Sequence, residues 1–382
     1  MAFSGLASNE RFTASQVRED IARMIATLSP KEAPLLAWLG DPDTFATSTK
    51  HEFMEDFMLP NYLVASTAIS SATAATGFQI NGLGLALTVG QILENETASY
   101  TELMQVTSIP GANSVLTSRN YGGGGVGSLV AGGQLYVRAA AGIEGQDHDG
   151  SSVRRLGTRR ANTVGHFYMP LAASGTDLAI NLAGGDSFNG VIGKGLIDVV
   201  HQLEKEVIRG VLNSTNSLGT TAQTRTMQGI RTQLTTINST ITAASFAANP
   251  HLYIGNVWQA IYDQGGSPDT EDWALVAGAT WFRDISNLND TKVQDSNEKE
   301  SFKRVIREYN GPLGKASVIL SRVLPATEAL LVPRQRLKVV PLQGRSFVYE
   351  DIAKTGDNVK GQIVGEYTLE LFHEAAMGRF HT

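Results

Sequence analysis

One long helical pattern constrains the fold more than any other segment: DSFNGVIGKGLIDVVHQLEKEVIRGVLNS, residues 186–214. Asp186 or Ser187 can cap its start, and Gly219 with the Thr-rich loop after Asn213 can end it. Polar residues occupy the other faces, whereas apolar residues recur at helical spacing, namely Leu196, Val199 or Val200, Leu203, Val207 and Val211. A helix with one apolar stripe must bury it, so we predict that this helix lies against a sheet.

Residues 85–145 consist of short apolar runs separated by turn residues. The runs are LALTVGQIL, ELMQVTSI, SVLTSRNY and GSLVAGGQLYVRAAA, with Pro110-Gly111, Ala112-Asn113 and a glycine run between them. Regular strands with turn signals between them predict a compact all-β unit, either a small barrel or a sandwich. The preceding residues 65–84, ASTAISSATAATGFQINGLG, are small and polar, and we expect an exposed extended linker there.

Beyond the long helix, helical and strand-like segments alternate. NVWQAIYDQGG and ATWFRDISNL predict helices on either side of the strand WALVAG. Further strand material follows in VIREYNGPLGKASVILSRVLP, EALLVPRQRLKVVPL and GQIVGEYTLELFHEAAMGRF. Together with the β unit and the long helix, this order predicts an α+β fold with mixed sheets.

The first 48 residues have apolar side chains but little core of their own. A short helical stretch, SQVREDIARMIATL, is followed by PKEAPLLAWLG, where Pro30, Pro34 and Pro42 prevent one long helix. We expect Leu35 and Trp38 to be exposed in a single chain. This segment therefore predicts an extended arm that docks on something else.

The stretch RNYGGGGVGS, residues 119–128, raises the possibility of a phosphate-binding loop. Such a loop needs backbone N–H groups converging on the anion and a helix behind them, usually with a Gly-Lys-Ser/Thr sequence. Here Gly125 is followed by Val126, Gly127 and Ser128, and the next residues, LVAGGQLYVRA, are strand-like. We predict a mobile surface loop between two strands that binds no nucleotide.

Other motifs give no catalytic or metal site. The stretch beginning His51-Glu52 has Glu55 where a zinc-protease helix needs its second histidine. Asp147-His148-Asp149-Gly150 resembles the front of a calcium loop, but SSVRRLGT follows without the bidentate glutamate. The chain has no cysteine and no Gly-x-Ser-x-Gly sequence. We therefore expect no catalytic residue, no cofactor and no metal, although a triad assembled from distant residues stays open.

A basic cluster and the overall charge bear on partners. The formal net charge is −6, which argues against a general nucleic-acid binder. Four arginines lie close together beside two aspartates, which favours salt bridging over nucleic-acid recognition: Arg154, Arg155, Arg159 and Arg160. No apolar run approaches the roughly 20 residues of a membrane span, and the first residues lack a signal-peptide pattern, so we expect a soluble intracellular product.

The order of these parts resembles the major capsid protein of tailed bacteriophages, which has the Hong Kong ninety-seven fold. Several phrases are similar to one capsid subfamily in the same order: EAPLLAWLG, TKHEFMEDF, ANTVGHFYMPLAASGT, LEKEVIRGVLNS, WALVAG and GEYTLELFHEAAMG. The resemblance spans nearly the whole chain, and its specificity lies in the order and spacing of the phrases.

The resemblance implies a division of the chain. Residues 1–48 would be the N-terminal arm, and residues 49–180 the E-loop, carrying the β unit of about 85–145 as an insertion. Residues 181–240 and 344–382 would form the peripheral domain, with 186–214 as its spine helix, and residues 241–343 the axial domain. Some members cross-link subunits through a Lys-Asn bond, but no motif selects such residues here.

The resemblance also implies a non-enzymatic shell protein that self-assembles in the host cytoplasm into an icosahedral or prolate head around double-stranded DNA. Its partners would be copies of itself in hexamers and pentamers, with portal, scaffold and decoration proteins, and weak non-specific contact with packaged DNA. Candidate contacts between subunits are Leu35, Trp38 and the four arginines. An encapsulin-like cellular compartment of the same fold is the alternative, and a hydrolase with an unrecognised site is a more distant one.

Overall fold

The computed structural model describes residues 33–40, 44–56, 62–70, 77–80, 87–97, 100–111, 113–140, 158–179, 188–213, 224–287 and 308–382. These residues form two compact units. One contains the described residues of Met1–Thr49, Thr163–Gly229 and Val339–Leu369. The other contains those of Lys50–Asn162, Ile230–Lys338 and Glu370–Thr382.

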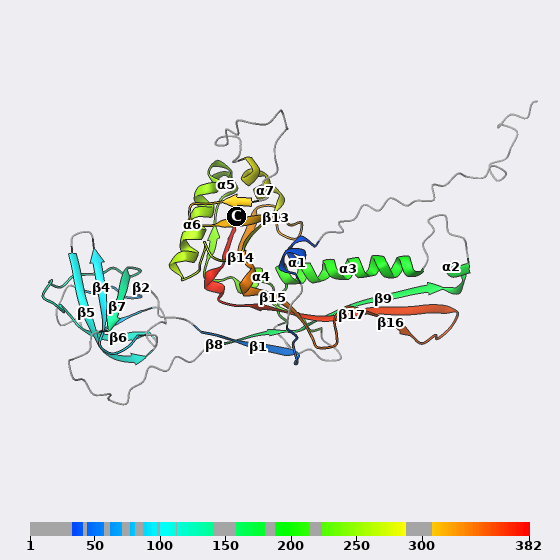
Figure 1. Cartoon of the computed structure of the whole chain (residues 1–382), viewed down its shortest axis with the longest axis horizontal. Helices are drawn as coiled ribbons and strands as arrows, with labels where there is room; N and C mark the ends of the chain where they lie inside the picture. The colour runs from blue at the N-terminus through cyan, green and yellow to red at the C-terminus, as the bar shows by residue number, and fades with distance from the viewer. Residues whose placement is uncertain are drawn as a thin grey trace, which may run out of the picture. The chain divides into compact units, whose positions relative to one another are not determined.

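The first unit is built around a long helix and an antiparallel sheet. Strand β17 (Asn358–Leu371) pairs with β9 (Gly165–Ser174) and β16 (Val348–Ile352), and β15 (Leu337–Pro341) is its neighbour in the sheet. Helix α3 (Phe188–Arg209) runs along β9 and β17 (Figure 1), and the short helices α1 (Pro34–Leu39) and α2 (Gly175–Ala179) belong to the same unit. A Cβ atom at Gly195 would lie 3.0 Å from Ile363 and 3.3 Å from Leu171, so α3 packs closely on this sheet.

The long helix confirms most of its predicted apolar face but ends early. Val199, Leu203 and Val207 are 0%, 5% and 0% exposed. Leu196 is 36% exposed, and Val211 lies beyond the helix and is 66% exposed, so these two positions do not belong to the buried face. Helix α3 ends at Arg209 because Gly229 donates its N–H to the carbonyl of Gly210, and a Cβ atom at Gly210 would lie 2.6 Å from the Met227 carbonyl.

The second unit contains a six-stranded mixed sheet in the order β10-β18-β14-β11-β13-β12. Its strands are β10 (Asn238–Thr240), β11 (Trp273–Ala277), β12 (Glu308–Asn310), β13 (Lys315–Leu320), β14 (Glu328–Pro333) and β18 (Gly378–His381). Its helices are α4 (Ile230–Gln233), α5 (Ala243–Ala248), α6 (Pro250–Asp263) and α7 (Ala279–Ser286). The helix, strand and helix predicted from NVWQAIYDQGG, WALVAG and ATWFRDISNL correspond to α6, β11 and α7.

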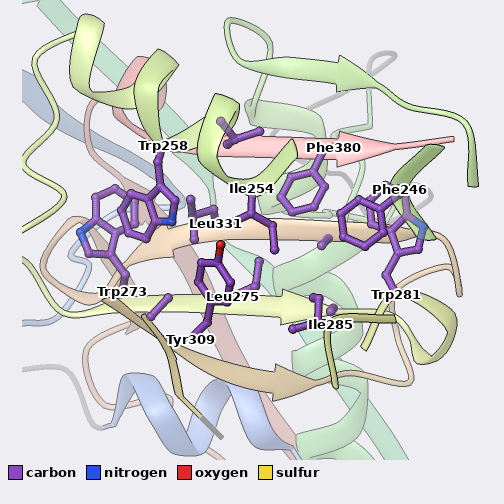
Figure 2. Close-up of a cluster of buried hydrophobic side chains, with 14 of the residues drawn as sticks. Phe246, Ile254, Trp258, Trp273, Leu275, Trp281, Ile285, Tyr309, Leu331 and Phe380 are labelled. Atoms are coloured by element: carbon purple, nitrogen blue, oxygen red, sulfur yellow. The ribbon is translucent and has the colours of Figure 1, made fainter. Parts of the chain in front are cut away.

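An aromatic core holds the helices on this sheet. Figure 2 shows the rings of Phe246, Trp281 and Phe380 grouped together, and the centroid of Trp281 lies 4.2 Å from that of Phe246 and 5.2 Å from that of Phe380. Trp258 of α6 meets Trp273 of β11 edge to face at 4.8 Å. All five rings are at most 2% exposed. Burial of this much aromatic surface provides the main stabilisation of the six-stranded sheet and its helices.

The second unit also contains a closed β barrel, whose extent differs from the prediction. Its strands follow the order β2-β7-β4-β5-β6-β3: β2 (Tyr62–Val64), β7 (Gln134–Ala140), β4 (Gln91–Thr97), β5 (Tyr100–Gly111), β6 (Ser114–Ser118) and β3 (Gly77–Gln79). Ala65 bridges Ile80, and Ser66 donates its N–H to the Gln79 carbonyl, so the first and last strands also meet.

The prediction of an exposed linker over residues 65–84 is wrong for its described part. Ala65, Ile69, Phe78 and Ile80 are at most 5% exposed and belong to the apolar core of the barrel. The barrel therefore begins at β2 rather than near residue 85. Small and polar residues favour loops by composition, but the few apolar residues of this segment are the ones that the barrel core buries.

The last described strand belongs to the six-stranded sheet. Strand β18 pairs with β14 and β10, so residues 378–381 lie in the six-stranded sheet and not with β16. Residues 230–240 likewise fall in the second unit.

The remaining elements are a two-stranded ribbon of β1 (Lys50–Glu55) and β8 (Thr158–Thr163), and short 3-10 turns at Arg334–Arg336 and Glu374–Ala376. Among the described helices, none is long and apolar enough to cross a membrane.

Candidate assembly surfaces

The glycine loop binds a carboxylate of its own chain. Glu102 of β5 accepts the N–H groups of Asn120 and Gly127 at 3.3 Å and 3.0 Å and two hydrogen bonds from Arg119 at 2.6 Å each. The N–H of Gly125 donates to the Asn120 side chain at 2.6 Å. The N–H groups of Asn120, Gly125 and Gly127 are therefore bonded to side chains of the chain itself, Glu102 and Asn120, and are not directed at an external anion.

Glu102 stays ionised despite its burial. Burial raises the pKa of this carboxyl, but the hydrogen bonds and charge of Arg119 and the N–H groups of Gly127 and Asn120 outweigh it, so the pKa of Glu102 is lowered overall. Arg119 also donates to the carbonyls of Ser70 and Gly127. The Arg119–Glu102 pair therefore joins three segments of the barrel: β5, the backbone at Ser70 and the loop that ends at Gly127.

The β1–β8 ribbon contains two of the four predicted arginines. Arg159 lies 3.3 Å from Glu52 and Arg160 lies 3.2 Å from Glu55, both across the ribbon. The predicted preference for salt bridging is thus found within the chain for these two residues. Their side chains stay 69% and 49% exposed, so each can also contact another molecule. Arg154, Arg155 and the neighbouring Asp147 and Asp149 lie outside the described residues.

The base of the ribbon is fixed by residues near the end of the chain. His51 Nε2 lies 2.5 Å from Glu370 Oε1, and the ring of Phe53 meets that of Phe372 edge to face at 4.9 Å. The backbone N–H of His373 donates to the buried Glu55 at 2.8 Å. His373 has a φ of 56°, a left-handed value that is uncommon for a residue with a side chain.

Sequence reasoning missed this anchor. Glu55 is conspicuous in the sequence only as the residue that spoils a zinc motif, and nothing in the sequence connects it to His373. The one available signal is that Glu366, Glu370 and His373 interrupt apolar strand-like segments, which is typical of buried polar residues with specific partners. Burial lowers the pKa of His373, as does the nearby Arg336, which favours a neutral ring.

Helix α1 docks on α3 through a buried carboxylate. Glu204 of α3 is 1% exposed and accepts the backbone N–H groups of Leu35 and Leu36. Leu35 is 0% exposed, contrary to the expectation that it is exposed in a single chain, because α1 covers its own unit rather than extending freely. Trp38 is half-buried on the same helix. Burial raises the pKa of Glu204 to about 7, although the two N–H groups lower it in part.

A groove of about 550 Å³ lies between β9, α3 and residues 224–227. Its polar side chains are His166, Lys205, Glu206 and Arg225 with Gln202 and two threonines. Glu366 lies beside the groove and forms ion pairs with Arg225 and Arg345; Arg345 Nε lies 2.6 Å from Glu366 Oε1. His166 Nδ1 lies 3.6 Å from the same oxygen. Within the part of the chain that the structure describes, no three histidine or acidic side chains gather as a metal site would require.

A family model and several solved structures are similar to this chain. The family model described as SU10 major capsid protein matches residues 6–382. None of the curated proteins compared with the chain matches it. Among solved structures, the capsid of the Myoviridae phage XM1 covers 97% of this chain and 98% of its own, at 10% sequence identity and a TM-score of 0.50. This likeness shows the fold: an α+β capsid fold of the Hong Kong ninety-seven type.

Two further structures are similar at lower scores. Mycobacterium phage Bobi covers 96% of both chains at 10% identity and a TM-score of 0.45. The capsid of the cyanophage P-SCSP1u covers 64% of this chain and 80% of its own at 10% identity, also at 0.45.

Proposed function

We propose which part of the shell each part of this chain forms. The premise is that the chain belongs to the SU10 major capsid protein family and forms the head shell of a phage. The first unit, with α3 as the spine helix, is the peripheral domain. The six-stranded sheet with α5, α6 and α7 is the axial domain. The β1–β8 ribbon is the base of the E-loop, and the barrel of residues 62–140 is inserted in that loop.

One observation carries this assignment: β1 and β8 pair with each other, although 102 residues separate Glu55 from Thr158. The chain thus leaves the ribbon, forms the barrel and returns to the ribbon. The barrel has its own apolar core and closes on itself through Ala65 and Ile80. Fixing the position of a barrel that is attached only through a two-stranded ribbon costs conformational entropy. Contacts with neighbouring subunits would offset this cost.

The proposed partners follow from the shell. Copies of this chain form hexamers and pentamers, and portal, scaffold and decoration proteins contact the same shell. Packaged DNA makes only weak, non-specific contacts because the net charge of −6 provides little neutralisation of phosphates. Membership in a phage capsid family favours this function over the encapsulin-like alternative, whose fold is of the same type.

The proposed contacts between subunits include Trp38, Arg159 and Arg160, which are half-buried or exposed in the single chain. Arg154 and Arg155 remain proposed contacts from the sequence. The buried side chain of Leu35 is instead assigned to docking α1 on its own subunit. Residues 1–32 lie outside the described residues and, with Trp38, remain proposed contacts from the sequence.

The test compares two exposed arginines that each have a carboxylate partner in their own chain. Arg159→Glu alters the ribbon, and the matched control Arg138→Glu alters the barrel, where Arg138 lies 2.6 Å from Glu94 and is 55% exposed. We expect the purified wild-type chain and Arg138→Glu to form closed shells under negative-stain electron microscopy, and Arg159→Glu to give folded but unassembled protein. Closed shells of normal size from Arg159→Glu would show that Arg159 of the ribbon is not needed for contacts between subunits.

A further inference from the structure

Helix α1 lacks the means to cap its own first turn. Its N-cap residue, Ala33, provides no side-chain hydrogen bond, and Pro34 at the first turn has no N–H to offer. The next two N–H groups, of Leu35 and Leu36, both donate to the carboxyl group of Glu204. Glu204 of α3 therefore caps the first turn of α1, which no residue of α1 caps, although the two helices are far apart in the sequence.

The environment of Glu204 is apolar on the side of α1. Helix α1, PLLAWL, carries no charged side chain, and Leu35 beside the carboxyl group is fully buried. On α3, His201 lies one turn before Glu204, Lys205 follows it and is exposed, and Ile208 lies one turn after it. No ion pair to Glu204 is present among the described residues, and its Oε2 atom has no hydrogen-bond partner there.

We propose that Glu204 is the positioning residue of the N-terminal segment, and that its carboxyl group holds α1 on α3 when protonated and weakens that hold when it loses the proton. A proton on Oε2, the oxygen without a partner, leaves the other oxygen to accept the N–H groups of α1. A charged carboxylate at the same place keeps these hydrogen bonds but stays buried beside an uncharged helix, with no ion-pair partner among the described residues, and this burial is unfavourable.

The direction of the pH dependence follows from the burial. The docked carboxyl group has its pKa raised to about 7, whereas the undocked group is in water and has its ordinary value. The docked state therefore binds the proton more tightly, docking is strongest below the docked pKa, and it weakens as the pH rises through that value. A single linked proton changes the docking equilibrium about tenfold between about pH 6 and about pH 8.

Trp38 reports on this helix. The chain has four tryptophans. Trp258, Trp273 and Trp281 are 0%, 2% and 0% exposed, so iodide quenching in the full-length chain measures mainly Trp38. Where α1 is mostly docked, quenching changes little, so the hydrogen-exchange protection of the α1 amides is measured beside it. We expect that protection, corrected for intrinsic exchange, to fall about tenfold from about pH 6 to about pH 8. Protection that stays constant over this range would overturn the proposal.

Three variants separate Glu204 from other causes. Glu204→Gln imitates the protonated acid and should keep α1 docked with no pH dependence, whereas Glu204→Ala should expose Trp38 at both pH values. His201→Gln removes the neighbouring titratable group and should keep the wild-type curve. A wild-type pH dependence in Glu204→Gln, or its loss in His201→Gln, would assign the switch to another group. The docking of α1 on α3 lies within one chain, so its pH dependence does not rest on the proposed function.

Discussion

Arg119 Nη2 lies 2.6 Å from Glu102 Oε2, and neither side chain is exposed to solvent. The same carboxylate accepts the N–H groups at both ends of the glycine run, from Asn120 and Gly127. The run of glycines is therefore wrapped around a buried ion pair. This explains why so many glycines occur together: Gly122, Gly123 and Gly125 have φ values of 83°, 80° and 95°, which residues with side chains adopt at a cost.

Breaking this pair should destabilise the barrel severely. Glu102→Gln leaves the Arg119 guanidinium buried without its counter-charge, and we expect a loss of about 3 to 5 kcal/mol in the free energy of unfolding. The matched control is Glu94→Gln, since Glu94 pairs with Arg138 at 2.6 Å on the exposed surface of the same barrel. The control should lose at most about 1 kcal/mol. Denaturant unfolding followed by circular dichroism measures both, and equal losses would contradict the buried role.

The Glu102 pair should also make stability depend on pH in the acid range. The pKa of Glu102 is lower in the folded chain than its ordinary value. Its contribution is therefore fully present above the ordinary pKa of a glutamate and is lost as the pH falls through the folded value. The difference in unfolding free energy between wild type and Glu102→Gln should shrink on acidification. A difference that grows on acidification would show that the carboxyl is neutral when folded.

The glycines of the loop should not be equally replaceable. Gly123→Ala places a side chain at a φ of 80° in open space, so the loss of roughly 1 to 2 kcal/mol comes from the backbone alone. Gly111→Ala is the control, because Gly111 has open space and no positive φ, and it should change stability by less than about 0.5 kcal/mol. Gly124→Ser should fall between them, since its Cβ would lie 3.1 Å from the Thr101 carbonyl. Thermal unfolding midpoints rank the three.

The long helix shows what periodicity can and cannot predict. The burial of Val199, Leu203 and Val207 follows from their spacing of four residues, because side chains at this spacing share one helix face. Glu204 is almost completely buried next to them, and no local pattern predicts this, since it depends on α1 covering the carboxyl group. Contacts between segments distant in sequence override local polarity.

The barrel shows the same limit for strands. Alternation and turn residues predicted β5 and β6, in which apolar residues alternate with polar ones. Composition alone misassigned residues 65–70 and 77–80, where the short strand β3 and single bridges such as Ile69 to Leu129 replace long strands. The ion pairs of the ribbon and the anchor from Glu55 to His373 join residues more than 100 positions apart, which one sequence cannot reveal.

Leu203→Ala should be costly because the side chain is 5% exposed on the face of α3 that packs on the sheet. We expect a loss of about 2 to 5 kcal/mol from lost transfer energy and the cavity left behind. Leu196→Ala on the same helix is the matched control, since Leu196 is 36% exposed and should cost less than half as much. Chemical denaturation compares them, and a larger effect at Leu196 would place the packed face of α3 elsewhere.

Two truncations should separate the arm's role in assembly from its role in stability. Deleting residues 2–32 keeps α1, so Leu35 stays buried and Glu204 keeps its two N–H donors; we expect an unchanged unfolding midpoint but no closed shells. Deleting residues 2–40 also removes α1, which uncovers the Glu204 carboxyl and the surface under Leu35. This second protein should be less stable as well as unable to close shells. Electron microscopy and thermal unfolding measure the two properties, and normal shells from the shorter deletion would show that the arm is dispensable for assembly.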